Sequence, residues 1–384
     1  MSPLLPGATL GILGSGQLGR MFAMAARRMG YRVVVYSPDA DSPAGTLADE
    51  EIVAGYEDEE TLFRFADRVD AVTLEFENVP VAALRALEGR TRVAPGPSVL
   101  EITQHRLREK EFVRSCGIGV PAFARVASET DAIAAVEAVG PSGVLKTATL
   151  GYDGKGQSRV RPGDDVSGIW RSLGSVEAIY EAFVPFAGEY SALAARGPAG
   201  EIATVGPTRN EHSHHILDVS VYPAGLSPRQ EQDARDISRE IAERLDVVGL
   251  ICVELFLTES GEWLVNELAP RPHNSKHWTI EGASISQFEL QVRAICGLPL
   301  PEVVAPRPAA MANLLGDVWS DGEPRWDEAL KTPETALHLY GKRDPRAGRK
   351  MGHLTSLAET PEQAEARVRA ARAALLSPKT STAS

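Results

Sequence analysis

Short apolar runs separated by amphipathic segments make up the N-terminal part of the chain. The run Ala8–Leu13 is followed by glycines, by the helix-like segment Gln17–Met29 and by a second apolar run. This order is typical of a right-handed βαβ unit in a parallel sheet. We therefore expect an open, Rossmann-like α/β domain over residues 1–103, with strands at Ala8–Leu13, Tyr31–Tyr36, Glu51–Ala54, Ala71–Glu75 and Thr91–Ala94.

The rest of the chain has an α+β pattern. A charged helix is predicted near Val99–Cys116, and two more between Pro228 and Leu245 and over Ser286–Cys296. We expect a second domain over residues 104–299 and a small, β-rich segment over 300–384 that packs on it. Predicted strands are Gly143–Ala148, Arg159–Arg161, Ala178–Val184, Tyr190–Arg196, Ile251–Leu257, Trp263–Leu268, Met311–Leu315, Ala336–Tyr340 and Met351–Thr355, before a polar tail, Ser377–Ser384, that we expect to be disordered.

Composition narrows the classes of function. A net charge of −12 argues against a general nucleic-acid binder, whose affinity comes from neutralising phosphates. No apolar run approaches the ~18 residues of a membrane span, and no basic side chain precedes the first apolar run. Cys116, Cys252 and Cys296 fit no metal or redox spacing. We expect a cytoplasmic protein with free thiols and no binding to membranes or nucleic acids.

Two glycine-rich segments could bind phosphates. Gly14–Gly19 fits G-x-G-x-x-G between a strand and a helix, as in dinucleotide sites, but no acidic residue closes the second strand where a nicotinamide cofactor would need one. A tight turn lining a substrate pocket is the better interpretation. Gly151–Gln157 lies between two predicted strands, and its amides could cover phosphates near Lys146, although an ordinary glycine-rich hairpin has the same pattern.

Glu254 and Glu267 each lie inside an apolar strand. A buried carboxylate is unfavourable unless it is paired or coordinates a cation, and magnesium prefers carboxylate and phosphate oxygens. If Leu257 pairs with Leu264 across a hairpin, the two glutamates lie directly opposite on one face. We predict a magnesium site there. Without metal, the carboxylates should raise each other's proton affinity. The alternative is a hairpin with two solvent-facing glutamates.

Three further segments allow both structural and binding roles. Glu181–Phe186 ends an apolar strand and could present backbone groups to an adenine, with Glu189 on the ribose. Asn210, His212, His214 and His215 form a predicted histidine-rich loop whose spacing fits no zinc motif, so substrate contact is favoured. A basic cluster, consisting of Lys342, Arg343, Arg346, Arg349 and Lys350, is either a solvated turn or a phosphate site.

Taken in order, these motifs resemble the ATP-grasp superfamily and, within it, the 5-(carboxyamino)imidazole ribonucleotide synthase family. The resemblance runs from Gly11 to about Thr355. Its most specific parts are Gly14–Met21, Gly151–Gln157, Asn266–Ser275 continuing through Thr279, Gly282–Glu289 and Gly348–Leu354. It implies an ATP-grasp fold and ATP-dependent carboxylation of 5-aminoimidazole ribonucleotide by bicarbonate. The chain after Gly352 is short and departs from the family pattern.

The resemblance also implies a role for each matching residue. Nucleotide contacts are implied for Arg106, Lys146, Gly151, Gly154, Lys155, Gly156, Gln157, Glu181, Ala182, Phe183, Val184, Glu189, His212, Asn266 and Glu267. Magnesium would bind Glu254 and Glu267, and bicarbonate and the imidazole would meet Tyr152, Asp153, Arg271, His273 and Asn274. Lys342, Arg349 and Lys350 would hold the ribonucleotide phosphate.

Partners and rival functions follow from the same resemblance. It implies a homodimer that passes a labile product to a downstream mutase. The nearest rival is another ATP-grasp ligase, such as a formate-dependent glycinamide ribonucleotide transformylase. A nicotinamide-dependent dehydrogenase and a non-enzymatic nucleotide sensor are disfavoured. A sensor has no need for paired carboxylates together with a basic pocket.

Overall fold

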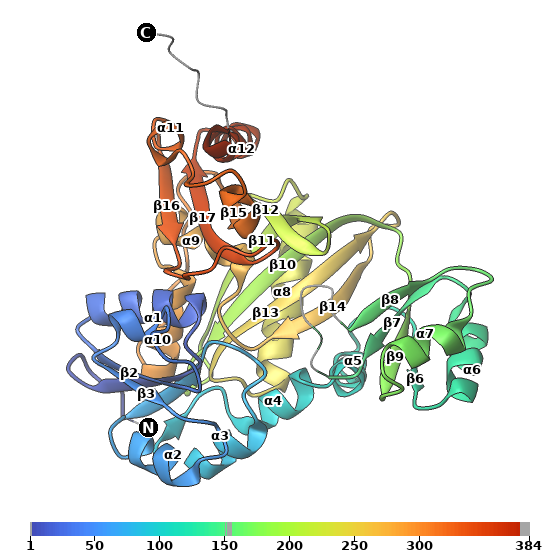
Figure 1. Ribbon diagram of the computed structural model, residues 1–384, viewed down its shortest axis with the longest axis horizontal. Coiled ribbons are helices and arrows are strands. Elements are labelled where there is room, and N and C mark those ends of the chain that lie inside the picture. The colour runs from blue at the N-terminus through green and yellow to red at the C-terminus, as the bar shows by residue number, and fades with distance from the viewer. Residues whose placement is uncertain (1, 150, 152–155, 377–384) are drawn as a thin grey trace.

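The computed structural model describes residues 2–149, 151 and 156–376. Within them, strands form sheets of five, four and eight members. Figure 1 shows the five-stranded sheet at the lower left, the four-stranded sheet at the right and the eight-stranded sheet between them, rising to the C-terminal elements. Tyr152, Asp153, Gly154 and Lys155, and the predicted disordered tail Ser377–Ser384, lie outside the described residues.

The N-terminal sheet is parallel, in the order β3-β2-β1-β4-β5. Leu10 and Ile12 pack on one face with α1 and α10, while Leu13 packs on the other with α2 and α3. The predicted Rossmann-like domain is confirmed, and each predicted strand matches to within one residue. The elements are β1 (Thr9–Leu13), α1 (Gln17–Arg28), β2 (Arg32–Ser37), η1 (Gly45–Leu47), β3 (Glu50–Val53), α2 (Glu59–Ala66), β4 (Ala71–Leu74), α3 (Val81–Leu87) and β5 (Arg92–Val93).

The charged segment after β5 contains two helices, α4 (Pro97–Thr103) and α5 (Arg106–Ser115). The prediction of one continuous helix is wrong because His105 has extended backbone angles, and α5 starts afresh after it. The N–H of Arg106 donates to the carbonyl of Ala148, 2.9 Å away. The break therefore joins the start of α5 to the end of β7 in the next sheet.

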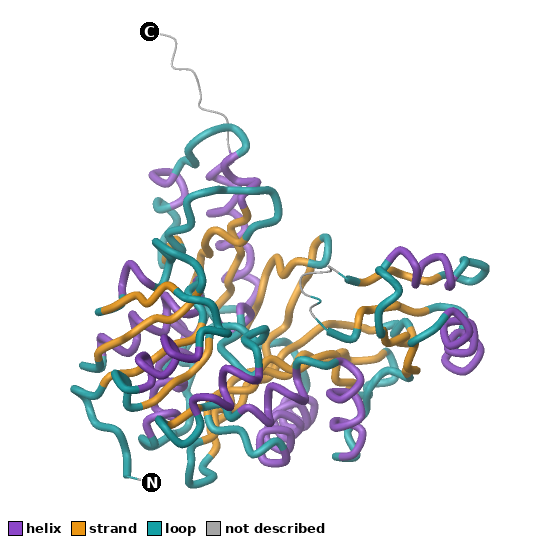
Figure 2. The backbone as a smooth tube through the Cα atoms, turned by 60° about the horizontal axis from the view of Figure 1, so that its bottom comes forward, coloured by secondary structure: helices purple, strands orange, loops and turns teal. Residues whose placement is uncertain are grey.

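The four-stranded antiparallel sheet has the order β6-β9-β7-β8. Two helices cover one face, where Leu145 and Tyr180 are buried. Because side chains alternate along a strand, Lys146 and Glu181 lie on the opposite face. In Figure 2 this sheet and its helices project at the right. The elements are β6 (Phe123–Val126), α6 (Glu129–Val139), β7 (Gly143–Thr147), β8 (Gln157–Val160), α7 (Val166–Ser172) and β9 (Ala178–Ala182).

The large sheet has the order β14-β13-β10-β11-β12-β15-β17-β16, so strands from both sides of residue 299 share one sheet. The boundaries at 103 and 299 stay predictions. The strands are β10 (Phe186–Arg196), β11 (Ile202–Ser213), β12 (Ile216–Tyr222), β13 (Gly249–Thr258), β14 (Trp263–Ala269), β15 (Ala309–Leu315), β16 (Thr335–Leu339) and β17 (Lys350–Leu357). The helices are α8 (Pro228–Arg244), η2 (Asn274–Lys276), α9 (Thr279–Gly282), α10 (Gln287–Cys296), η3 (Gly316–Trp319), α11 (Trp326–Ala329) and α12 (Pro361–Leu376).

Two details of this sheet bear on the site. α8 packs on the face of β13 that buries Val253, Leu255 and Leu257, which leaves the opposite face of the strand to Glu254. The predicted histidine-rich loop is a strand end: Asn210 and His212 lie in β11, and His214 and His215 form the turn after it. None of the described helices is long and apolar enough to cross a membrane.

Candidate functional site

Charged side chains from both antiparallel sheets meet at the start of α5. Arg106 lies with Nη1 3.3 Å from Glu267 Oε2, and its Nη2 donates to the carbonyl of Gly151 at 3.2 Å. On the small sheet, Lys146 Nζ lies 2.9 Å from Glu181 Oε2. Burial opposes ionisation of Glu181, but neighbouring lysine ammonium groups lower its carboxyl pKa to about 2. Two fixed cations therefore lie beside the glycine-rich loop.

The two carboxylates predicted to bind magnesium face one another. Glu254 pairs directly with Glu267 in the antiparallel ladder of β13 and β14, and directly opposed residues share a face. The prediction of their opposition is confirmed. The predicted pair Leu257–Leu264 is wrong, because Leu257 pairs with Trp263. A register shift between Glu254 and Leu255, a β-bulge, accounts for the difference.

Glu254 is held by an imidazole. Its Oε1 lies 3.0 Å from His273 Nε2. Burial opposes ionisation of Glu254, but the bond and charge of His273 lower its pKa to about 2. Despite its own burial, His273 has its pKa raised to about 10 by Cys252 and Glu254. The expectation that the opposed carboxylates raise each other's proton affinity is therefore wrong for Glu254, because the histidine outweighs the second glutamate.

The carboxylate pair suits a hard divalent cation. The Glu254 side chain is 16% exposed and the Glu267 side chain 41%, so a ligand can reach the pair from one side. Among residues 2–149, 151 and 156–376, no three His, Cys, Asp or Glu side chains are arranged to hold a metal by themselves. The remaining ligands would therefore come from nucleotide phosphates and water, which is the usual magnesium arrangement.

Glu189 and His212 meet on neighbouring strands. The Glu189 carboxylate forms an ion pair with His212 Nδ1. Burial opposes protonation of His212, but the hydrogen bond that its ring donates to Glu189 and the charge of Glu254 raise its pKa. The pair thus lies near the Glu254 carboxylate of β13. His214 shares a hydrogen bond with Ser213 in the turn beyond β11.

Three of the residues predicted to line the bicarbonate pocket, Arg271, His273 and Asn274, lie beyond the end of β14, whereas Tyr152 and Asp153 lie outside the described residues. Arg271 forms a two-point ion pair with Glu77 of the N-terminal domain, including an Nη2–Oε1 distance of 2.8 Å. Burial opposes ionisation of Glu77, but Arg271 lowers its carboxyl pKa to about 2. Asn274 is buried, and neither side-chain amide atom has a hydrogen-bond partner among the described residues. A buried unpaired amide is unfavourable, so it is well placed to serve a ligand.

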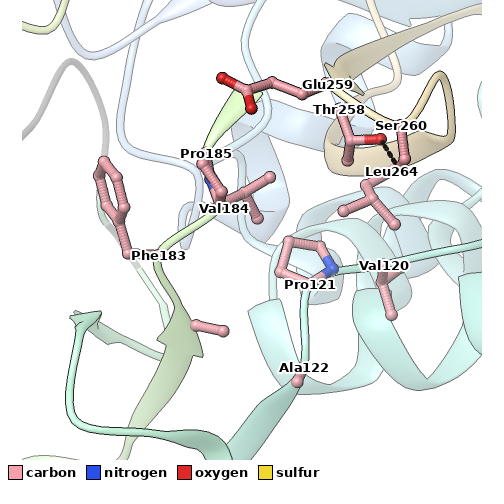
Figure 3. A pocket seen from close by; sticks show the side chains of 11 residues that line it. Val120, Pro121, Ala122, Phe183, Val184, Pro185, Thr258, Glu259, Ser260 and Leu264 are labelled. Atoms are coloured by element: carbon pink, nitrogen blue, oxygen red, sulfur yellow. Dashed lines mark hydrogen bonds between the residues drawn. The ribbon is translucent and has the colours of Figure 1, made fainter. Parts of the chain in front are cut away.

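A cavity of about 360 Å³ opens beside the end of β9 (Figure 3). Its walls are mostly apolar, with Phe183, Val184 and Pro185 on one side and Leu264 on the other. Thr258 also lines it and lies on the same face of β13 as Glu254, four residues away. The cavity therefore opens on the carboxylate face of the large sheet.

The basic cluster lies on the chain between β16 and β17 and ends at Lys350, the first residue of β17. Lys342 Nζ donates to the carbonyl of Lys350 at 2.8 Å, and Arg349 Nη1 donates to that of Asp344 at 2.9 Å. Arg343 pairs with Asp41 at the surface, 3.2 Å away. Burial raises the pKa of Glu75, and the positive charges of Arg271 and Lys342 partly offset this rise. Lys342 of the basic cluster therefore lies close enough to the glycine turn of the N-terminal domain to act on Glu75 electrostatically.

The first glycine motif binds a carboxylate of the chain itself. The N–H groups of Gly16 and Gly19 donate to Glu75 at 2.8 and 3.2 Å. Burial raises the pKa of Glu75 in spite of these bonds. The amides that would meet a dinucleotide pyrophosphate are thus already bonded, which argues against a nicotinamide site and favours the tight turn.

Comparison with known families covers most of the chain. The ribonucleotide synthetase preATP-grasp domain matches residues 7–104, and the ATP-grasp domain matches residues 111–288. The phosphoribosylaminoimidazole carboxylase C-terminal domain matches residues 309–367. These three regions hold, in order, the glycine turn, the opposed Glu254 and Glu267, and the basic cluster.

Full-length relatives decide the family. The N5-carboxyaminoimidazole ribonucleotide synthase of Brucella melitensis is 42% identical, covering 92% of this chain and 97% of the relative. That of Bacillus subtilis is 41% identical, covering 94% of each. This chain belongs to the N5-carboxyaminoimidazole ribonucleotide synthase family. It is accordingly an ATP-dependent ligase, and the predicted ATP-grasp fold is confirmed.

Solved structures of the synthase family have the same fold. An ADP complex of N5-carboxyaminoimidazole ribonucleotide synthetase matches with a TM-score of 0.92 and 38% identity, over 97% of this chain and 98% of that one. The Aspergillus clavatus synthase in complex with ADP and 5-aminoimidazole ribonucleotide matches with a TM-score of 0.89 and 27% identity, over 97% of this chain and 99% of that one.

Sequence reasoning missed several residues of this synthase-family site. Glu75 and Glu77 follow β4, and carboxylates at the carboxyl end of a parallel strand are placed at the usual ligand crevice. Glu109 and Lys110 lie on the buried face of α5 with Leu107 and Val113. The two charged residues share the helical spacing of these apolar residues, and that spacing could have indicated that they face the core and not the solvent.

The glycine turn allows a test of its contact with Glu75. Gly14 has φ +95°, and a Cβ there would lie 2.7 Å from Glu75 Cγ. Gly14→Ala should lower the free energy of unfolding by about 2–4 kcal/mol, from backbone strain plus overpacking. Gly89→Ala is the matched control, with φ +83° and no atom within 4 Å of the added Cβ. Urea unfolding should give the larger loss for Gly14→Ala. Equal losses would remove the contact with Glu75 from the explanation.

Proposed function

We propose that this chain uses ATP and bicarbonate to carboxylate the exocyclic amine of 5-aminoimidazole ribonucleotide, a step of purine biosynthesis. ATP-dependent carboxylation of this ribonucleotide is the activity of the family to which the chain belongs. One observation carries the assignment of the site. Glu254 and Glu267 lie directly opposite one another on β13 and β14. Glu267 pairs with Arg106, which is assigned to the phosphates, and Glu254 pairs with His273, which is assigned to bicarbonate and the imidazole.

The nucleotide base is assigned to the cavity beside β9. Its apolar walls suit an adenine ring. The N–H groups of Ala182 and Phe183 already donate to the carbonyls of Ala122 and Ser142. We therefore assign the adenine edge to the backbone of Val184, while Glu189 is assigned to the ribose and His212 orients Glu189.

The phosphates are assigned to the cations at the start of α5. Arg106 and Lys146 would meet the β- and γ-phosphates, and the backbone of Gly151, Gly156 and Gln157 would border them. Gly154 and Lys155, which lie outside the described residues, are assigned to the nucleotide by the family resemblance. Glu254 of β13 and Glu267 of β14 would hold magnesium, with Asn266 beside them, its Nδ2 3.5 Å from Glu254 Oε2. When bound, magnesium would offset negative charge on the transferring phosphoryl group.

The reaction is proposed to proceed in two displacements. An oxygen of bicarbonate attacks the γ-phosphorus, the bond to the bridging oxygen breaks, and ADP leaves with the electron pair, giving carboxyphosphate. The amine nitrogen then attacks the carboxyl carbon, phosphate leaves, and the amine loses a proton. Arg271, His273 and Asn274 would hold bicarbonate and the imidazole, and the family resemblance assigns Tyr152 and Asp153, which lie outside the described residues, to the same pocket.

The ribonucleotide phosphate is assigned to Lys342, Arg349 and Lys350. Arg349→Ala should raise the KM for the ribonucleotide about 10- to 150-fold, the equivalent of ~1.5–3 kcal/mol for a charged hydrogen bond. The KM for ATP should not change. Arg343→Ala, which removes an exposed guanidinium paired with Asp41, is the control and should leave both values unchanged. If Arg349→Ala raised both KM values equally, the cluster would serve ATP or the fold.

The decisive assay measures ADP formation with each substrate withheld in turn. Release of ADP should require both 5-aminoimidazole ribonucleotide and bicarbonate. Formate with glycinamide ribonucleotide should not replace them. Replacement by that pair would favour the transformylase alternative and overturn the assignment of substrate.

We also propose that the enzyme works as a homodimer and passes its carbamate product to a downstream mutase. An N-carboxylated amine is labile, because loss of carbon dioxide regenerates the amine. Sedimentation at increasing protein concentration tests the assembly, and a monomer at all concentrations would contradict it.

A further inference from the structure

The β-bulge on β14 decides whether Glu254 and Glu267 can act together. From Trp263 to Val265 the strand pairs in one register with β13, and from Glu267 to Ala269 in a register shifted by one residue, so Asn266 is the extra residue. Side chains alternate between the two faces of a sheet, so a one-residue slip moves a side chain to the other face. If the register of Trp263 to Val265 continued without the bulge, Glu267 would pair with Val253 and point toward the α8 core.

Two consecutive side chains of α5 bond the backbone around this bulge. Lys110 Nζ donates to the carbonyl of Val265 at 3.1 Å and to that of Asn266. Glu109 Oε2 accepts the N–H of Leu268 at 2.9 Å. The Lys110 and Glu109 side chains are 1% and 2% exposed. The two contacts therefore hold the strand on both sides of the residue that opposes Glu254.

The same lysine reaches the phosphate side of the site. Lys110 Nζ lies 3.7 Å from Glu181 Oε2, which also meets Lys146. Arg106, one helical turn before Lys110, pairs with Glu267. A single face of α5 therefore touches the bulge, one of the opposed carboxylates and the carboxylate that orients Lys146.

We propose that Lys110, together with Glu109, is a positioning residue that holds the Asn266 bulge and so keeps Glu254 and Glu267 on one face for the metal. This rests on the proposed role of the two glutamates as magnesium ligands. Groups that orient metal ligands from behind contribute about 10- to 100-fold to metal affinity. Lys110 touches neither substrate nor metal and acts through the strand.

A second buried lysine provides the matched control. Lys276 is fully buried, and its Nζ donates to the carbonyl of Ser191 at 2.8 Å and to Thr208 Oγ1 at 2.6 Å. Its described hydrogen bonds therefore go to β10 and β11 rather than to the bulge. Lys276→Met removes a buried ammonium of the same kind and reports what such a loss does to stability alone.

The experiment measures binding of Mn²⁺ with ADP by electron paramagnetic resonance. Mn²⁺ serves as a paramagnetic probe for the divalent site. Lys110→Met should weaken this binding about 10- to 100-fold. Lys276→Met, compared at a similar loss of unfolding free energy, should keep the wild-type affinity. Hydrogen exchange at the Leu268 amide should accelerate in Lys110→Met, because the strand beside it is released. The KM for the ribonucleotide should not change.

Wild-type Mn²⁺ affinity in Lys110→Met, or an equal loss in Lys276→Met, overturns the positioning role. If Lys110→Met does not fold, Glu109→Leu removes the other contact and must produce the same loss. Glu254→Gln and Glu267→Gln separate the two levels of the argument. Unchanged Mn²⁺ affinity in both would refute the metal assignment itself. Weakened binding in both, with Lys110→Met unchanged, refutes only the role of Lys110.

Discussion

Replacing Lys146 with methionine is expected to lower kcat for ADP formation about 100- to 1,000-fold, the usual effect of removing one preorganised group that stabilises a transition-state charge. Lys146 is buried on the inner face of the small sheet, and Glu181 fixes its ammonium at 2.9 Å. A fixed cation needs no reorganisation when charge develops on the transferring phosphoryl group. Methionine keeps an unbranched side chain that is one atom shorter and removes the charged ammonium group.

The fold should survive this change because Glu181 retains a second cation. Lys110 Nζ lies 3.7 Å from the same carboxylate oxygen. Circular dichroism and urea unfolding should therefore show a folded protein, while steady-state ADP release shows the loss. Lys331→Met, on the exposed turn that follows α11, is the control. A folded Lys146→Met variant with wild-type turnover would remove Lys146 from the phosphate site.

The parallel domain could be predicted because its apolar runs are short, continuous and bounded by glycines. Strands β11 and β12 were missed for the opposite reason. Asn210, Ser191 and Ser220 form a buried hydrogen-bonded chain across three strands, with distances of 3.0 Å between successive members. Polar residues that satisfy one another in this way hide the alternation of a buried strand.

Helix α12 was missed because its buried face is made mainly of small residues. Ala364, Val368, Ala371 and Leu375 recur at helical spacing and pack on β15 and β17. Two alanines in four positions give a weak apolar pattern, which was further obscured by the charged residues between them. The helix becomes evident only when the strands that it covers are known.

Part of the candidate site could be predicted, because its charged residues interrupt the apolar pattern of their strands. Glu254 and Glu267 stood out because carboxylates interrupted apolar strands, and their opposition is confirmed. The register beyond them was not predictable, because it depends on where Lys110 and Glu109 bond the backbone of β14. Tertiary bonds of that kind leave no periodic trace in the sequence. For the same reason, the carboxylate of Glu75 could not be placed against the amides of Gly16.

The stability that Glu254→Gln loses relative to wild type should depend on pH. Glu254 Oε1 lies 3.0 Å from His273 Nε2. Removing one member of a buried ion pair leaves the other charge unpaired, which costs about 3–5 kcal/mol. We therefore expect a loss of that size in the free energy of unfolding near pH 5.5, measured in urea with a chelator present. Glu267→Gln, which leaves the histidine bond intact, is the control.

The direction of the pH dependence follows from the two pKa values. The pKa of Glu254 is lowered from 4.5 to about 2, so its contribution is present above pH 4.5 and is lost as the pH falls toward 2. The pKa of His273 is raised from 6.5 to about 10, so its contribution is complete below pH 6.5 and is lost as the pH rises toward 10. The difference between wild type and Glu254→Gln should thus be greatest between pH 4.5 and 6.5 and should shrink by pH 9.5, where His273 can lose its proton. A difference that stays constant over this range would mean that Glu254 stabilises the fold without an ionised His273.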